Sequence, residues 1–111
     1  MNRKIRFTAA GRRLLMHVTT DQGRPYTHAC DNAVFEEAAW WIQQLNARRF
    51  SGPELWAALP QVPHTQLDVA LAFLKHYGCV LRCGRYCYAP SVTVYEDALG
   101  LLEHQAEILP L

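Results

Sequence analysis

The sequence predicts one α+β domain that is mostly helical, with a short β-hairpin or arm at the N-terminus and a helix at the C-terminus. Hydrophobic residues alternate with polar ones near the N-terminus, whereas from residue 33 onward they recur at steps of three and four. The chain has 111 residues, 50% of them hydrophobic, which suffices for one domain with a buried core. We therefore expect residues 1–30 to form N-terminal strands or a basic arm and residues 31–111 the remainder of a single globular unit.

Residues 3–8 and 13–20 are predicted to be two short strands. Ile5 and Phe7 alternate with basic and hydroxyl side chains, which gives a period of two. The apolar run in the second segment is equally compatible with part of a helix. Residues 21–31 contain a glycine, a proline and two aspartates, and this composition predicts a loop.

Residues 33–49 are predicted to be a helix because their apolar positions form one stripe. These positions are Val34, Ala38, Trp41, Ile42 and Leu45. Glu36 and Glu37 near the start of the segment, and Arg48 and Arg49 near its end, would complement the helix dipole.

Ser51 and Glu54 have the spacing of a capping box, with Pro53 at a position that needs no amide partner. A short helix is expected to follow and to end at Pro60.

The next predicted helix covers residues 64–77. Its expected buried stripe is Leu67, Ala70, Leu71, Leu74 and Tyr77, and Gly78 follows where a left-handed residue ends many helices.

Residues 79–89 predict a strand, a tight turn at Gly84 and Arg85, and a second strand. Thr93 and Glu96 have the spacing of a second capping box, which would open a last helix. The apolar side of that helix is Val94, Ala98, Leu101, Leu102 and Ile108.

The order of these elements resembles the winged helix-turn-helix superfamily. The resemblance is carried by the segments Glu54–Leu59, Val62, Thr65–Leu74, Tyr77–Val80 and Gly84–Tyr86, and covers roughly a third of the chain. In that superfamily a β-hairpin wing follows the second helix of the motif almost at once, as here. The resemblance implies a transcriptional regulator that binds duplex DNA through helix 64–77 and the wing 79–89.

A recognition helix needs polar side chains in its first turn that reach base edges or phosphates, and His64, Thr65 and Gln66 are expected to face outward there, with Val69 as a further candidate. Thr65 is alternatively a helix cap partnered by Asp68, whose carboxylate would repel phosphate. The predicted DNA-contacting residues are His64, Thr65, Gln66, Lys75, Arg82, Arg85, Arg3, Arg6, Arg12 and Arg13. The arginines suit phosphate because the guanidinium is planar and bidentate, although each is also compatible with an ordinary solvated surface.

The four cysteines, Cys30, Cys79, Cys83 and Cys87, are expected to be thiols in a reducing cytoplasm. The C-x-x-C pairs typical of zinc sites do not occur, so small buried thiols that pack the wing against the core are the preferred interpretation. No metal or other cofactor is therefore expected, and a metal- or redox-responsive wing remains the weaker alternative.

No glycine-rich phosphate loop, G-x-S-x-G or H-E-x-x-H motif occurs, so an enzyme is not expected. No apolar run is long enough to span a membrane and no secretory signal opens the chain, which favours a cytoplasmic location. A homodimer through helix 93–108 would suit a two-fold related operator. The net charge of +1 and the off-stripe position of Trp40 favour the alternative function, a winged-helix adaptor that binds protein and not DNA.

Overall fold

The computed structural model describes residues 3–108, with side chains through Gln105. Its N-terminal part is an antiparallel sheet in the order β1-β2-β3, made of β1 (Arg3–Ala10), β2 (Arg13–Thr20) and β3 (Tyr26–Asp31). Gly11 turns the chain between β1 and β2 with a φ of 62°, a left-handed value that glycine adopts without steric cost. The two predicted strands are therefore confirmed.

The prediction of a loop over residues 21–31 is confirmed for 21–25 and wrong for the rest, because Tyr26–Asp31 forms the third strand. Its sequence carries little apolar alternation, since only Cys30 is buried and the first three residues are exposed. Pairing with β2, from Val18 opposite Tyr26 to Arg13 opposite Asp31, holds the segment in the sheet. Tertiary pairing thus determines this strand more than local propensity does.

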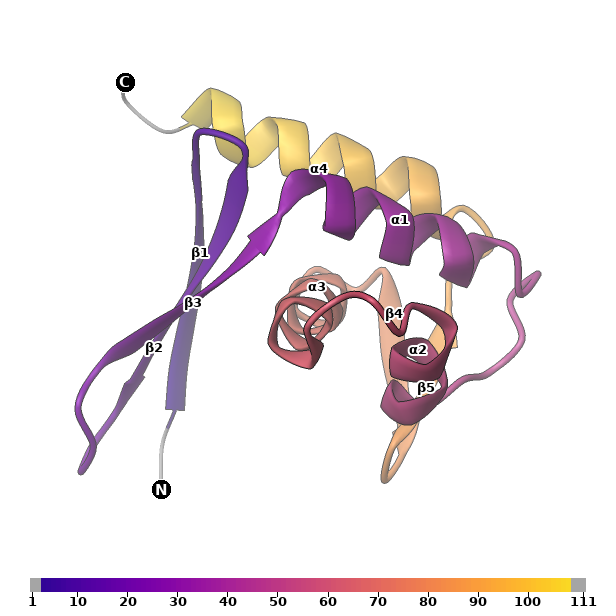
Figure 1. Cartoon of the computed structure of the whole chain (residues 1–111), viewed down its shortest axis with the longest axis horizontal. Coiled ribbons are helices and arrows are strands. Elements are labelled where there is room, and N and C mark those ends of the chain that lie inside the picture. The colour runs from indigo at the N-terminus through magenta and orange to yellow at the C-terminus, as the bar shows by residue number, and fades with distance from the viewer. Residues whose placement is uncertain (1–2, 109–111) are drawn as a thin grey trace.

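The helices are α1 (Asn32–Gln43), α2 (Gly52–Ala58), α3 (His64–His76) and α4 (Val94–Ile108), and a second sheet pairs β4 (Val80–Gly84) with β5 (Cys87–Pro90). Figure 1 shows α1 and α4 side by side above α3, with the three-stranded sheet on one flank of α3 and α2 with the β4–β5 hairpin on the other. The described residues therefore form an α+β domain with four helices and two antiparallel sheets.

The predicted helix 33–49 is too long at its C-terminal end. Helix α1 stops at Gln43, and Asn46 and Ala47 take left-handed φ values of 52° and 67°. Arg48 and Arg49 consequently lie exposed in the connection to α2 and do not complement the dipole of α1. The next residue, Phe50, exchanges backbone hydrogen bonds of 3.0 and 2.8 Å with Tyr88, which fastens this connection to β5.

The capping predictions have different outcomes. Ser51 Oγ accepts from the Glu54 amide at 3.2 Å and the Glu54 carboxylate accepts from the Ser51 amide at 3.1 Å, so the first capping box is confirmed. Gly78 has the expected left-handed φ, at 78°. At the start of α4, the Thr93 amide donates to Ser91 Oγ at 3.1 Å and the Thr93 hydroxyl donates to Asp97 Oδ2 at 2.9 Å, so the capping box expected between Thr93 and Glu96 is wrong.

The core joins both sheets to the helices. Phe73 of α3 makes edge-to-face contacts with Phe7 of β1 and Phe35 of α1, with ring centroids 5.3 and 5.2 Å apart. The predicted burial of Leu67, Ala70, Leu71 and Leu74 is confirmed. Tyr77 lies beyond the end of α3 and is partly exposed, and the outward position expected for Val69 is wrong, because Val69 is fully buried. Helix α3 contacts β3 as well as α1, so it is covered on more than one side.

Helix α4 uses its apolar side within the chain. Val94, Ala98 and Leu102 are buried, and α4 contacts both α1 and β1. The sequence argument for a homodimer through residues 93–108 assumed that this side had no partner, and that assumption is wrong. Within the described residues, none of the helices combines the length and apolar character needed to cross a membrane.

Candidate nucleic-acid interface

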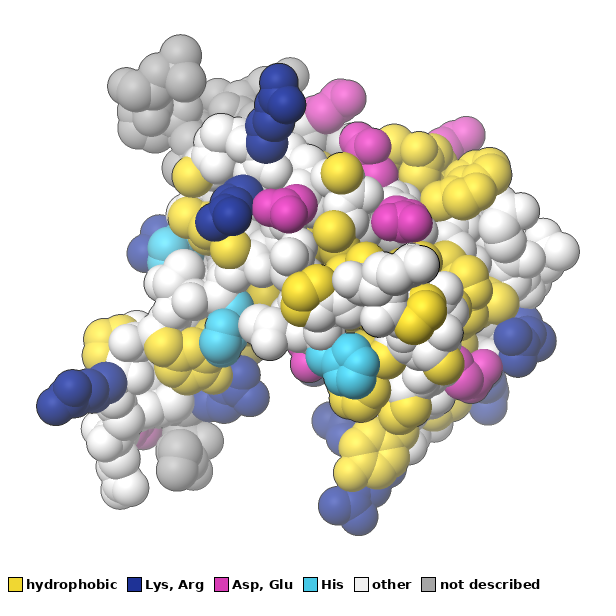
Figure 2. Space-filling model, viewed as in Figure 1, with side chains coloured by type: hydrophobic (Ala, Val, Ile, Leu, Met, Phe, Trp, Pro, Cys, Tyr) yellow, Lys and Arg dark blue, Asp and Glu magenta, His cyan; other side chains and the backbone are white. Residues whose placement is uncertain are grey.

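One side of helix α3 is open to solvent. Its exposed or half-exposed residues are Thr65, Asp68, Ala72, Lys75 and His76, which we call the α3 stripe. The spacing of three and four residues places them along one side of the helix. Other sides of α3 are covered by α1, α2, β3 and β4. The stripe therefore faces the gap between the β2–β3 hairpin and the β4–β5 hairpin, which both project in Figure 1. Figure 2 shows this gap as a hollow between two projecting lobes.

The first turn of α3 is tied to α2 through Trp56. The His64 ring stacks on Trp56 with centroids 4.5 Å apart and planes inclined by 10°. The Trp56 Nε1 donates a hydrogen bond to Asp68 Oδ1 at 2.9 Å. Asp68 is therefore engaged with Trp56. Thr65 is not the N-cap of α3, because the N-cap residue is Pro63, which makes no side-chain cap bond, so the expected Thr65–Asp68 cap is wrong. His64 and Thr65 remain exposed as expected.

Gln66 does not face outward. Its side chain is half-buried, and Oε1 accepts a hydrogen bond from the backbone N–H of Asp31 at 3.0 Å. This bond fastens α3 to the end of β3, directly before α1 begins. The structure therefore gives Gln66 a tertiary contact in place of the expected base contact.

Lys75 lies at the other end of the stripe, beside the second sheet. Together with Asp68 and Tyr88 it lines a hollow of about 170 Å³ between α3 and β5. The Lys75 side chain is exposed, so its ammonium group is available to an anion that lies along the stripe.

The β4–β5 hairpin carries the two predicted wing arginines at its exposed end. The Arg85 guanidinium lies over the ring of Tyr86, 5.6 Å from its centroid, and Arg82 Nε donates to the Gly84 carbonyl at 3.3 Å. The expectation that all four cysteines are thiols is wrong for this hairpin, because Cys83 and Cys87 form a disulfide. Cys30 and Cys79 are free and buried, as expected.

The arginines of the N-terminal strands do not form one patch. Arg3 is the first residue of β1, and its guanidinium lies 3.5 Å from the Tyr26 hydroxyl. The turn that contains Arg24 lies at the same end of the sheet. Arg13 lies at the opposite end of the β1–β2 pair and forms an ion pair of 3.2 Å with Asp31. At about 3.3 Å per residue, roughly 20 Å of strand separates the two ends.

Arg12 and Arg6 also do not share a site with Arg3. Arg12 lies in the β1–β2 turn, and its carbonyl accepts from the Asn32 amide at 2.8 Å. Arg6 pairs in register with His17, one position from the buried Phe7, so alternation places it on the sheet face opposite α3. Of the four predicted arginines in the N-terminal sheet, only Arg3 lies on the sheet face that covers α3. It also lies at the end of the sheet that is next to the α3 stripe.

His17 is the central polar residue of that outer sheet face. Its Nε2 lies 2.7 Å from Thr8 Oγ1 and its Nδ1 lies 3.1 Å from Thr27 Oγ1. Partial burial, and then the positive charge of Arg6, lower the pKa of His17 below its ordinary value of 6.5. The neutral imidazole is therefore favoured here, and this face gains no cation from His17 at neutral pH.

Acidic side chains gather on the far side of the molecule from the α3 stripe. They are Glu36, Glu37, Glu96, Asp97 and Glu103, on α1 and α4. In Figure 2, carboxylates concentrate over the upper helices and arginine or lysine side chains lie on both lower lobes, with further basic side chains at the upper end of the sheet. The net charge of +1 thus conceals an uneven distribution: carboxylates crowd α1 and α4, while arginines lie on both sides of the hollow, together with Asp21 in the turn that carries Arg24 and Asp68 on the stripe.

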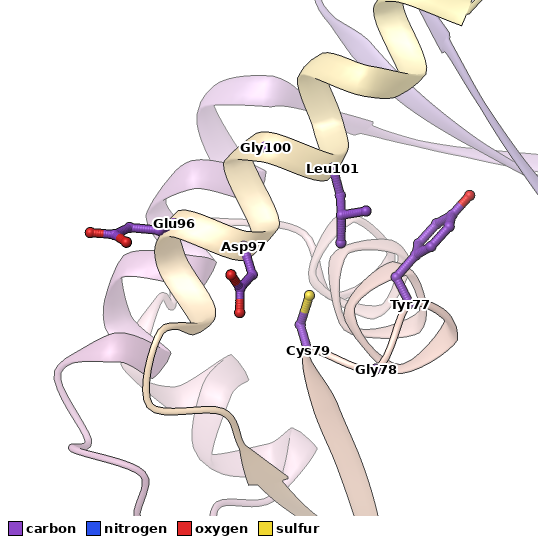
Figure 3. A pocket seen from close by; sticks show the side chains of 7 residues that line it. All are labelled: Tyr77, Gly78, Cys79, Glu96, Asp97, Gly100 and Leu101. Atoms are coloured by element: carbon purple, nitrogen blue, oxygen red, sulfur yellow. The ribbon is translucent and has the colours of Figure 1, made fainter.

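A separate hollow of about 450 Å³ lies between α4 and the turn that joins α3 to β4. Figure 3 shows Asp97, Cys79 and Leu101 directed into it, while Glu96 points away. Burial, and then the charge of Asp97, raise the pKa of the Cys79 thiol, so the thiol stays protonated at neutral pH. A reactive cysteine requires the opposite shift. Among the side chains through Gln105, no three His, Cys, Asp or Glu side chains are placed to share a metal ion.

Two features of the site were not predicted from the sequence, the Trp56–Asp68 hydrogen bond and the Cys83–Cys87 disulfide. The hydrogen bond joins two helices and has no local sequence signal. The disulfide does have one, because the predicted hairpin already places Cys83 and Cys87 on either side of its turn, where facing side chains are close enough to be linked. No protein-family model, curated protein or solved structure matches this chain.

Proposed function

We propose that this chain is a winged helix-turn-helix protein that binds duplex DNA and acts as a transcriptional regulator. The order α1-α2-α3-β4-β5 supports the fold, with β4–β5 as the wing. The pairing of Phe50 with Tyr88 also supports it, because it adds the segment before α2 to the edge of that wing. In this proposal α3 is the recognition helix.

A single observation carries the proposed function. The exposed stripe of α3 lies between two projecting hairpins that bear arginines, while the carboxylates of α1 and α4 lie on the far side. A major groove about 12 Å wide admits one α-helix, and the DNA backbone then passes on either side of that helix. Hairpins that flank the helix are therefore in position to meet phosphates.

The proposed contacts follow from this arrangement. Arg82 and Arg85 of the wing and Arg3 and Arg24 of the sheet end contact phosphates, and Lys75 joins them along the stripe. His64 and Thr65 are the residues placed to reach base edges. Gln66, Arg6, Arg12 and Arg13 are not included, because their contacts or positions direct them elsewhere.

The decisive experiment is a fluorescence-anisotropy titration of a mixed-sequence duplex of about 20 base pairs, roughly two helical turns. We expect binding at about 50 mM salt that weakens steeply toward about 200 mM, with a slope of roughly −0.9 per phosphate contacted. Five contacts would give a slope of roughly −4 to −5. An absence of binding at the lowest salt concentration rejects the proposal.

One observation favours the second candidate, a winged-helix adaptor that binds protein. Trp40 and Val92 are 53% and 73% exposed, and with Tyr95 and Gln43 they line a hollow of about 150 Å³ at the end of α1 and the start of α4. Exposed aromatic residues of this kind are enriched where proteins bind one another. The titration separates the two functions, because an adaptor would show no salt-dependent binding to mixed-sequence DNA.

A further inference from the structure

The disulfide between Cys83 and Cys87 closes the tip of the β4–β5 hairpin. Arg82 pairs with Tyr88 and Gly84 pairs with Cys87, so Cys83 is the extra residue of a bulge in β4. A bulge sets two residues of one strand opposite a single residue of the other. Cys83 thereby faces Cys87, at a Cα–Cα distance of 5.1 Å, and the two sulfurs are joined.

The ring made by this disulfide contains Gly84, Arg85 and Tyr86. Tyr86 has a φ of 66°, in the left-handed region that residues with a side chain rarely adopt. The Arg85 guanidinium rests over the Tyr86 ring, so the position of the arginine depends on the backbone of its neighbour. The disulfide is the covalent link that keeps this turn in its present shape.

The two pairs of cysteines differ in their access to solvent. Cys83 and Cys87 are half-buried, next to an exposed turn at the end of a projecting hairpin. Cys30 and Cys79 are buried, and burial raises the pKa of the Cys30 thiol to about 12. Since thiol–disulfide exchange needs a thiolate and an accessible sulfur, exchange with small reagents is confined to the wing pair.

We propose that Cys83 and Cys87 form a thiol–disulfide exchange site that sets the conformation of the wing tip and, through Arg85, the affinity of the chain for DNA. The reductant is an external dithiol. Its thiolate attacks one sulfur of the disulfide, the S–S bond breaks and a mixed disulfide forms, which the second thiol of the reagent then resolves. Two electrons and two protons pass to the chain, so Cys83 and Cys87 become thiols and the reagent becomes a disulfide. The reverse reaction uses a low-molecular-weight disulfide as oxidant.

Reduction removes the link that closes the turn. Tyr86 is then free to leave the left-handed region, and Arg85 loses its fixed position over the Tyr86 ring. The conformational part of this inference is independent of DNA, whereas the effect on affinity rests on the proposed function. The test therefore measures the two parts separately.

The conformational part is tested on the full chain, treated either with oxidised glutathione or with dithiothreitol and then freed of reagent. Alkylation followed by mass spectrometry of the native protein should find two rapidly modified thiols only after reduction, at Cys83 and Cys87. Trypsin should cleave after Arg85 several-fold faster in the reduced chain. Cleavage after Arg12, in the exposed turn between β1 and β2, is the internal control and should not change.

The second part compares the two forms in the DNA titration. Reduction should weaken binding about 3- to 10-fold, the range expected for the loss of one ordinary hydrogen-bonded contact. The double variant Cys83→Ser/Cys87→Ser should behave like the reduced chain and should not respond to dithiothreitol. A response that persists in this variant would assign the effect to other groups and overturn the proposal.

Two further results have distinct meanings. If oxidised glutathione leaves four thiols open to alkylation after denaturation, or if cleavage after Arg85 is the same in both forms, the exchange site is refuted. If cleavage changes but neither form binds DNA at about 50 mM salt, the proposed function fails and the exchange site stands.

Discussion

The indole N–H of Trp56 donates a hydrogen bond to the carboxylate of Asp68 at 2.9 Å, across the junction of α2 and α3. This bond accounts for an acidic residue on the exposed side of a helix that we propose to contact DNA. The carboxylate orients Trp56, and Trp56 in turn stacks on His64. Asp68 thus stabilises the start of α3, at the cost of a negative charge close to the proposed phosphates.

Asp68→Asn should separate these two effects. The amide oxygen can still accept from Trp56, while the negative charge is removed. We expect DNA affinity to rise about fivefold, because a unit charge about 4 Å away contributes roughly 1 kcal/mol in water. Asp68→Ala is the comparison, since it removes the charge and the acceptor together and should lower stability as well. Unchanged affinity in Asp68→Asn would place the stripe away from phosphates.

Gln66→Ala should destabilise the fold, because it leaves the half-buried Asp31 N–H without its acceptor. The expected loss in the free energy of unfolding is about 1–3 kcal/mol, measured by urea titration. Gln61→Ala, at an exposed position in the turn before α3, is the control and should change stability by less than about 0.5 kcal/mol. A stable Gln66→Ala chain with an altered sequence preference would instead support base contact by Gln66.

Leu74→Ala should cost about 2–5 kcal/mol, the usual range for truncation of a buried leucine. Leu74 is fully buried in α3, whereas Leu81 of the wing is 65% exposed. Leu81→Ala therefore removes the same atoms from a solvated position and should change stability by less than about 0.5 kcal/mol. Chemical denaturation of both variants tests the difference, and equal losses would contradict the packing of α3.

Arg85→Ala and Arg3→Ala should each lower affinity for every DNA sequence alike and reduce the salt slope by about 0.9. The physical reason is that phosphates repeat regardless of sequence. Arg12→Ala is the matched control, because Arg12 lies in the turn at the opposite end of the sheet from Arg3. An equal loss in all three variants would point to a general charge effect and not to contacts around the α3 stripe.

The lowered pKa of His17 predicts a loss of stability in acid. Because the folded state holds the imidazole neutral, the unfolded state takes up the proton first as the pH falls below the ordinary value of 6.5. Urea titrations at about pH 7.5 and about pH 5.5 bracket the range in which histidine changes charge. The wild-type chain should lose more stability between them than His17→Gln, which keeps polar contacts to Thr8 and Thr27 within reach but does not titrate. Parallel losses in the two proteins would remove His17 as a cause.

Local sequence signals predicted the helices and hairpins whose periodicity agrees with their burial. Helix α3 is an example, since Leu67, Leu71 and Leu74 follow its buried side and Gly78 marks its end. The end of α1 was not predictable in this way, because the left-handed residues that stop it are Asn46 and Ala47 and include no glycine. Strand β3 was missed because it is held by pairing with β2 and carries little apolar alternation.

The candidate site was less predictable than the fold, for a physical reason. Exposed polar residues look alike in sequence whether they are free or engaged. Gln66 and Asp68 are two residues apart on α3, yet one bonds to the backbone of β3 and the other to a tryptophan of α2. Similarly, Arg3 and Arg13 are close in sequence but lie at opposite ends of the antiparallel pair.

The edge-to-face contact of Phe7 with Phe73 makes the N-terminal sheet inseparable from the rest of the chain. A fragment that begins at Asp31 would lose the Phe7 ring that packs against Phe73, a side chain that is fully buried in the complete fold. The sheet therefore functions as one wall of the hydrophobic core and not as a detachable extension. A gene fusion or a proteolytic product that kept only the helices and the β4–β5 hairpin would lack the packing that holds α3 in place.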